Sequence, residues 1–103
     1  MTIVRMWESR VLPDKTEEIA AFLKAMVASL RTVDGCLGVE VFGSAPGNPS
    51  DDDRIVIISR WRDQAALASA AGPGWRTETV DADGESGLWA RPPHVWHFET
   101  WPL

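Results

Sequence analysis

His97 is one of only two histidines in the sequence and the side chain best suited to acid–base chemistry. Imidazole has an ordinary pKa near neutral pH, so the pattern predicts His97 as a catalytic general base. The alternative is a structural histidine, bonded to a backbone carbonyl or to Glu99 on the same strand face. His94 lies three residues away and faces the other side of an extended strand, so the pair predicts no metal site.

Arg5 is the second candidate for a catalytic role. A buried guanidinium is costly unless a carboxylate pairs with it, or unless an anionic or enolate oxygen of a ligand binds it. Because side chains alternate along a strand, Arg5 shares one face with Trp7 and Ser9. We therefore predict that Arg5 binds a developing oxyanion, with Trp7 and Ser9 beside the ligand.

Six tryptophans among 103 residues are the third chemical signal. Indole offers flat apolar surface and one hydrogen-bond donor, which suits a planar polycyclic or phenolic ligand. We predict Trp7, Ser9, Trp61 and Trp75 as substrate-binding residues, with Trp75 and Trp89 covering the pocket. Tryptophans that only fill the core or an interface are the alternative, which we prefer for Trp96 and Trp101.

Composition narrows the class of protein. The chain has the length of one domain, residues 1–103, and it is hydrophobic enough to bury a core. A net charge of -5 with no run of Lys and Arg argues against nucleic acid. No stretch reaches the ~20 apolar residues of a membrane span, and no signal peptide is evident, so we expect a cytoplasmic protein without a membrane partner. With one cysteine, Cys36, no multi-cysteine metal site is expected.

Hydrophobic periodicity predicts the elements that position these residues. Asp14 and Glu17 resemble a helix-capping pair, and Asp63 is placed to cap a second helix that ends at Gly72. Residues 72–93 show no regular pattern. Strands are predicted over 2–12, 36–42, 54–61 and 94–101, with helices from 14 to about 31 and over 64–71. This β-α-β-β-α-β order is typical of an α+β, ferredoxin-like fold, with a four-stranded antiparallel sheet and both helices on one face.

The strands are apolar on both faces, although two helices cover only one. In the first strand Ile3 and Trp7 alternate with Val4 and Met6, and the third and last strands follow the same pattern. A second copy of the chain is the commonest cover for such a face, so we predict a homodimer. A monomer whose segment 72–93 folds across the face is the alternative.

Several short motifs also follow a known order and spacing. With them the chain resembles the antibiotic biosynthesis monooxygenase superfamily over nearly its whole length. The motifs are Val4-Arg5-Met6-Trp7 before Val11 and Pro13, Asp34-Gly35 with Gly38, Ile58-Ser59-Arg60-Trp61 running into Asp63-Gln64-Ala65-Ala66-Leu67, Ala71-Gly72-Pro73 with Trp75, and Val95 with His97-Phe98-Glu99. The resemblance implies a dimeric α/β barrel in which each subunit has its own pocket between sheet and helices.

The activities of the superfamily carry over unevenly. Trp61 matches the pocket tryptophan of heme-degrading members, but Ser9 stands where they have asparagine, and no histidine lies between Gln64 and Arg91 to hold heme iron. Quinone-forming members have an asparagine and a tyrosine where this chain has Ile57 and Leu67. The resemblance therefore implies no bound cofactor and reproduces neither known active site.

Two functional hypotheses follow. The first is a cofactor-independent monooxygenase, or related small-molecule enzyme, acting on an aromatic or polyketide-like substrate. His97 is its base, Arg5 its oxyanion partner, and Trp7 and Trp61 line its cleft. The second is a non-catalytic, ligand-binding or stress-related dimer, which the absence of both known active sites favours. A cyclase or isomerase using the same pocket is a further alternative.

Overall fold

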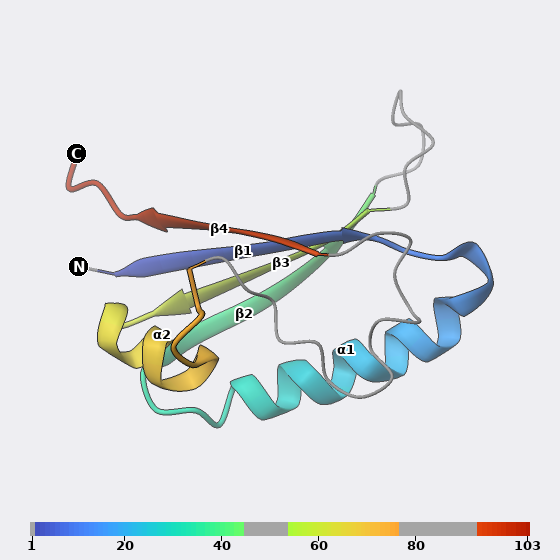
Figure 1. Cartoon of the computed structure of the whole chain (residues 1–103), viewed down its shortest axis with the longest axis horizontal. Coiled ribbons are helices and arrows are strands. Elements are labelled where there is room, and N and C mark those ends of the chain that lie inside the picture. Colours follow the sequence, from blue (N-terminus) through green and yellow to red (C-terminus); the bar gives the residue numbers. More distant parts are fainter. Residues whose placement is uncertain (1, 45–53, 77–92) are drawn as a thin grey trace.

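The structure is a computed structural model that describes residues 2–44, 54–76 and 93–103. Six main elements follow one another in the predicted order β-α-β-β-α-β (Figure 1). Their bounds are β1 (Ile3–Arg10), α1 (Thr16–Leu30), β2 (Cys36–Gly43), β3 (Arg54–Trp61), α2 (Gln64–Ala71) and β4 (His94–Glu99). The α+β, ferredoxin-like fold predicted from periodicity is therefore confirmed.

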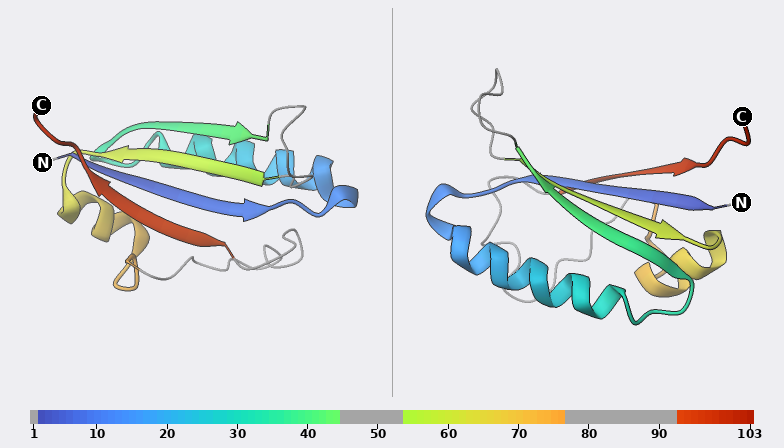
Figure 2. Two further views of the ribbon diagram at one scale, coloured as in Figure 1. Left: turned by 90° about the horizontal axis from the view of Figure 1, so that it is seen from above. Right: turned by 180° about the vertical axis from the view of Figure 1, so that it is seen from behind.

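The four strands pair antiparallel in the order β2-β3-β1-β4, and both helices lie on the same side of the sheet (Figures 1 and 2). β2 and β3 are consecutive in the chain and pair directly, and β3 lies inside the sheet. β4 is an edge strand and pairs with β1, which lies inside the sheet. The register sets Arg5 opposite His97 on one side and opposite Ser59 on the other.

Two buried clusters form the core between the sheet and the helices. The predicted apolar stripe of α1 packs on the first cluster, with Ile19 and Leu23 buried. The clusters are Trp7, Ile19, Leu23, Val39 and Ile57, and Ile3, Trp61, Ala66 and Leu67. Burial of such side chains contributes about 1.5–3 kcal/mol each, which holds both helices on this face.

The position of α2 is fixed at both of its ends and in its middle. The Ala66 amide donates to Asp63 Oδ1 at 2.8 Å, and Gly72 ends the helix with a φ of 90°, so both predicted boundaries are confirmed. Gly35, in the turn before β2, has a φ of +87°, and a Cβ there would lie 2.5 Å from the Ala66 Cβ. Any residue other than glycine at position 35 would clash with α2, so glycine is what lets the turn pack this closely against the helix.

The predictions were wrong about the ends of three elements. β1 ends at Arg10 rather than at residue 12, and the other two are the start of α1 and the end of β4. Residues Pro13–Lys15 form a 3-10 turn, and Lys15 occupies the cap position of α1 without a side-chain hydrogen bond, so Asp14 does not cap this helix. Proline fixes its own φ and favours such a tight turn, which delays the start of α1 to Thr16. β4 ends at Glu99, and Trp101 lies beyond it, 75% exposed.

The face of the sheet without helices presents large apolar side chains to solvent. Phe42, Trp96 and Phe98 are 47%, 42% and 51% exposed in the single chain. Trp96 and Phe98 lie on the edge strand β4, and Phe42 lies on the opposite edge strand β2. Large apolar patches on a surface often mark interaction sites. Within the described ranges, neither helix is long and apolar enough to cross a membrane.

Candidate functional site

Arg5 and His97 meet on the helix-covered face of the sheet, at the pairing of β1 with β4. Arg5 Nη1 lies 3.3 Å from His97 Nε2 and donates a hydrogen bond of 2.9 Å to the backbone carbonyl of Trp75. The two residues are 92 positions apart in the sequence, and they are the two predicted catalytic residues. The sequence expected Glu99 or a carbonyl to orient the histidine, whereas in the structure its polar contact is with Arg5.

Trp75 and Arg76 complete this group from the turn that follows α2. The Trp75 ring stands edge-on to His97, with centroids 4.8 Å apart at 89°. The Arg76 guanidinium lies 4.8 Å from the centroid of the same indole, in a cation–π contact. Arg5, His97, Trp75 and Arg76 together are called the Arg5–His97 site below.

The electrostatics of the site keep His97 neutral. Burial lowers the pKa of His97 below its ordinary value of 6.5, and the positive charges of Arg5 and Arg76 lower the pKa further. Burial also lowers the pKa of Arg5. A neutral imidazole at pH 7 is an acceptor of protons, which is the state that a general base requires.

The other predicted binding residues lie deeper in the molecule. Trp7 is in the first core cluster and Trp61, 2% exposed, is in the second, where its Nε1 donates to Ser59 Oγ at 2.9 Å. Ser9 is fully buried. The predicted common face of Arg5, Trp7 and Ser9 is confirmed by the strand register. Trp61 lies on the same face, since it pairs with Ile3. Their contact with a ligand stays a prediction.

Trp75 is the one predicted binding tryptophan beside the Arg5–His97 pair, and it is only partly buried against the second cluster. Trp89, the other residue predicted to cover the pocket, lies outside the described residues. Sequence reasoning missed Arg76 and the carbonyl of Trp75. No periodicity or motif marks either group, because a backbone carbonyl is common to every residue and Arg76 follows an irregular turn.

A hollow of about 360 Å³ opens elsewhere, between the turn before β2 and α2. Its charged lining is Asp34, Arg62 and Asp63, and Arg62 forms ion pairs with both carboxylates at 3.5 and 3.7 Å. Such exposed, mutually paired charges are typical of a solvated surface. We place the candidate site at Arg5 and His97, where the groups with shifted pKa values lie, and not in this hollow.

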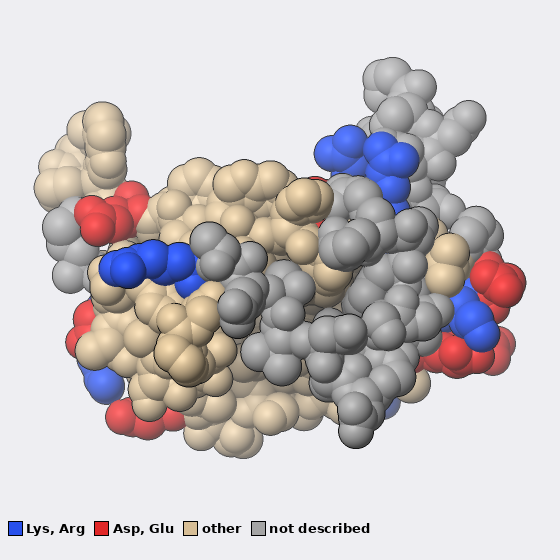
Figure 3. Space-filling view, in the orientation of Figure 1, with Lys and Arg blue, Asp and Glu red and all other residues tan. Residues whose placement is uncertain are grey.

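The other charged residues do not gather on the visible face. On the face shown in Figure 3, the basic and acidic side chains of the described residues lie in small, separate groups. Among residues 2–44, 54–76 and 93–103, no three His, Cys, Asp or Glu side chains gather to hold a metal ion.

The fold and site thus define a small ferredoxin-like domain with an arginine–histidine pair under the edge of its sheet. The sequence profile of the antibiotic biosynthesis monooxygenase family matches residues 2–77. That range covers most of the 103 residues, and the chain belongs to this family. The resemblance noted from the short motifs is therefore confirmed. No curated protein is similar enough in sequence to match.

Solved structures share the whole architecture. A protein from Mycobacterium tuberculosis, Rv0793, is similar with a TM-score of 0.75 and 22% identity, over 100% of this chain and 98% of its own. A conserved protein from Methanosarcina mazei has a TM-score of 0.76 and 14% identity, over 98% and 94%. PA3566 from Pseudomonas aeruginosa has a TM-score of 0.70 and 20% identity, over 97% and 94%. At such identities the likeness establishes the fold alone.

Proposed function

We propose that the protein is a cofactor-independent monooxygenase of small aromatic, phenolic substrates, with His97 as the general base and Arg5 as the oxyanion partner. The carrying observation is the approach of Arg5 Nη1 to within 3.3 Å of His97 Nε2 on the helix-covered face. A base and a fixed positive charge lie side by side there, which is the pairing needed to form and stabilise a phenolate. Membership of the antibiotic biosynthesis monooxygenase family supports the same reaction class.

The proposed reaction needs a base and a positive charge from the protein. His97 takes the hydroxyl proton of an electron-rich phenol, or the acidic ring C–H proton of an anthrone, and Arg5 stabilises the resulting oxyanion. The electron-rich ring carbon then donates electrons to O₂ and a carbon–oxygen bond forms, giving a hydroperoxide once a proton returns. Loss of water breaks the oxygen–oxygen bond and leaves a carbonyl, so one oxygen atom enters the product and the other leaves as water. Trp75, edge-on to His97, offers apolar surface to the ring of the substrate.

Pairing of two copies through the helix-free face belongs to the same proposal. Phe42, Trp96 and Phe98 are half-exposed on that face, and aromatic side chains are enriched at protein interfaces. The Arg5–His97 site lies on the opposite face, so pairing leaves it accessible from the helix side. Each subunit would then carry its own site.

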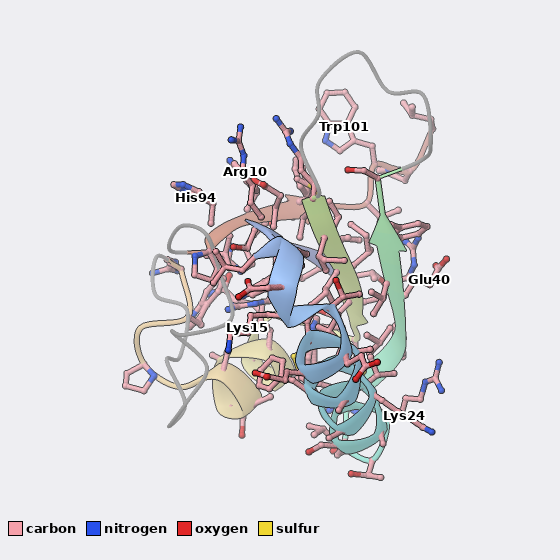
Figure 4. The ribbon with its side chains drawn as sticks, turned by 90° about the vertical axis from the view of Figure 1, so that its right-hand side faces the viewer. Arg10, Lys15, Lys24, Glu40, His94 and Trp101 are labelled. Carbon is pink, nitrogen blue, oxygen red and sulfur yellow. The ribbon has the colours of Figure 1, made fainter. Side chains whose placement is uncertain are left out.

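Oxygen uptake against a panel of anthrones, naphthols and hydroquinones, each with and without a carboxylate beside the reacting hydroxyl, tests the reaction. Turnover should fall about 10²–10⁴-fold in His97→Gln, while binding of the same compounds changes little. His94→Gln is the matched control, because His94 is exposed on the helix-free side and points away from α1 (Figure 4). That variant should keep full turnover.

Two results would contradict the proposal. Equal turnover in His97→Gln and the unaltered chain would remove His97 from the mechanism. No oxygen uptake across the panel, with tight binding of the same compounds, would instead assign the protein to the non-catalytic ligand binders.

A further inference from the structure

The guanidinium of Arg5 determines which nitrogen of His97 carries the proton. Arginine has only donors, so a hydrogen bond between Arg5 Nη1 and His97 Nε2 requires Nε2 to accept. The single proton of the neutral ring is then on Nδ1. The same Nη1 group donates to the carbonyl of Trp75 at 2.9 Å, which holds the guanidinium against Nε2.

This arrangement occupies the lone pair that a base must use. While Arg5 Nη1 donates to Nε2, that nitrogen is not available to a substrate hydroxyl. A ligand must therefore draw Arg5 toward itself before His97 takes a proton. An anionic oxygen does so, because a charge-assisted hydrogen bond to guanidinium is stronger than one to a neutral imidazole.

We propose that Arg5 acts as a positioning residue that holds His97 in its Nδ1–H tautomer and releases Nε2 only when an anionic oxygen of the ligand binds the guanidinium. The proposal rests on the proposed function, since it concerns the same site. It also names the ligand class: an aromatic ring with an anionic oxygen group and a hydroxyl on neighbouring positions. The anionic group binds Arg5 and the hydroxyl binds Nε2.

The distance between the two protein atoms is the basis for this ligand class. Arg5 Nη1 and His97 Nε2 are 3.3 Å apart in the free protein. A small shift of the guanidinium opens Nε2 and still leaves the two groups side by side, so one molecule reaches both only if its two oxygen groups are close together. Groups on adjacent ring positions satisfy this condition, whereas groups at opposite ends of a ring do not. Trp75 lies against His97 and Arg76 lies over Trp75, which places apolar surface and a second positive charge beside the pair.

The charges around His97 determine how its pKa changes when the ligand binds. Those that lower its pKa are Arg5 of β1 and Arg76 after α2, and the carboxylate on the same face of β4 is Glu99. A bound anion offsets the charge of Arg5, so the pKa of His97 rises when the ligand is present. The imidazole thus becomes a stronger base in the complex than in the free protein.

Nitrogen NMR of the full chain with ¹⁵N-labelled histidine tests the tautomer. The free protein should show His97 with a protonated Nδ1 and an unprotonated Nε2. Arg5→Met, which has no donor, should shift His97 toward the Nε2–H tautomer, and His94 in the same spectrum should not change. An Nε2–H tautomer in the unaltered protein, or the same tautomer with and without Arg5, would overturn the proposal.

A pair of isomers tests the ligand class. 2-Hydroxybenzoate and 4-hydroxybenzoate have the same atoms and the same charge at neutral pH and differ in the position of the hydroxyl, which in the 2-isomer also hydrogen-bonds to the carboxylate. The 2-isomer should bind about tenfold more tightly or better, since only it reaches both groups, and Arg5→Met should remove this preference. Equal affinities for the unaltered chain would overturn the proposal.

Both tests are decided on the unaltered chain even where Arg5→Met fails to fold. Neither needs oxygen or turnover. A confirmed tautomer and isomer preference with no oxygen uptake would contradict the monooxygenase and leave the role of Arg5 intact. Oxygen uptake that depends on His97, with equal isomer affinities, would support the monooxygenase and contradict the proposed role of Arg5.

Discussion

The two faces of the sheet are built from the same strands and have different chemistry. On the helix-covered face, Arg5 and His97 lie together beside a buried core. On the other face, Trp96 and Phe98 of the same strand are half-exposed. Because side chains alternate along a strand, β4 sends one residue to the site and its two neighbours to the opposite surface. One six-residue strand therefore serves two roles that point mutations can separate.

Substitutions of Trp61 and Trp75 should give the largest difference between a core residue and a site residue. Trp61→Ala removes a side chain that is 2% exposed and should cost about 3–5 kcal/mol in the free energy of unfolding. Trp75→Ala, the matched control, should cost clearly less, because Trp75 is only partly buried, yet it should weaken aromatic ligands more. Urea unfolding and fluorescence quenching by 2-hydroxybenzoate measure the two effects.

Trp61→Phe keeps an aromatic ring and tests the prediction that Trp61 also contacts ligand. Binding that weakens far more than folding would support that prediction. Strong destabilisation with unchanged quenching would assign Trp61 to the core alone.

A substitution on the helix-free face should change the oligomeric state. Light scattering should give about twice the 11.4 kDa mass of one chain, and Phe98→Glu should return the mass to that of a single chain. A charge buried at an apolar interface without a partner is costly, and this cost opposes pairing. Lys24→Gln changes the net charge equally but lies on the outer side of α1, so it should remain paired (Figure 4). A monomeric unaltered chain would contradict the dimer.

A smaller effect should come from the glycines that flank the second core cluster. Gly35→Ala should cost about 1–2 kcal/mol for the left-handed backbone alone, with the contact to Ala66 adding to it. Gly38→Ala is the matched control, since nothing lies within 4 Å of its added Cβ. Thermal unfolding compares the two. Equal losses would mean that the turn does not fix α2.

The smallest expected effect is a pH dependence of stability from His97. Its pKa is lowered in the folded protein, so below the ordinary value of 6.5 the unfolded chain binds a proton that the folded chain resists. Stability should therefore fall as the pH drops from 7 through this value and below it. His97→Gln should flatten that part of the curve of unfolding free energy against pH, and His94→Gln should leave the contribution of His97 in place. A curve that His97→Gln does not alter would contradict the pKa shift.

Local sequence determined the elements and their order. Period-two alternation located β1 and β3, helical spacing located α1, and Asp63 with Gly72 marked both ends of α2. These signals are local, because each depends on residues a few positions apart. One of the failed predictions, a cap by Asp14, is local as well: residues Pro13–Lys15 form a 3-10 turn, and α1 begins only after it.

The Arg5–His97 site was decided by tertiary structure. The sequence put Arg5 on a strand face and named His97 as a base, but it offered Glu99 or a carbonyl as the partner of the histidine. Only the pairing of β1 with β4, in the register that sets Arg5 opposite His97, brings the two together. Strand register depends on contacts between residues distant in sequence, and a shift by one residue would move either side chain to the other face. For that reason the residue types were readable from the sequence, and their partnership was not.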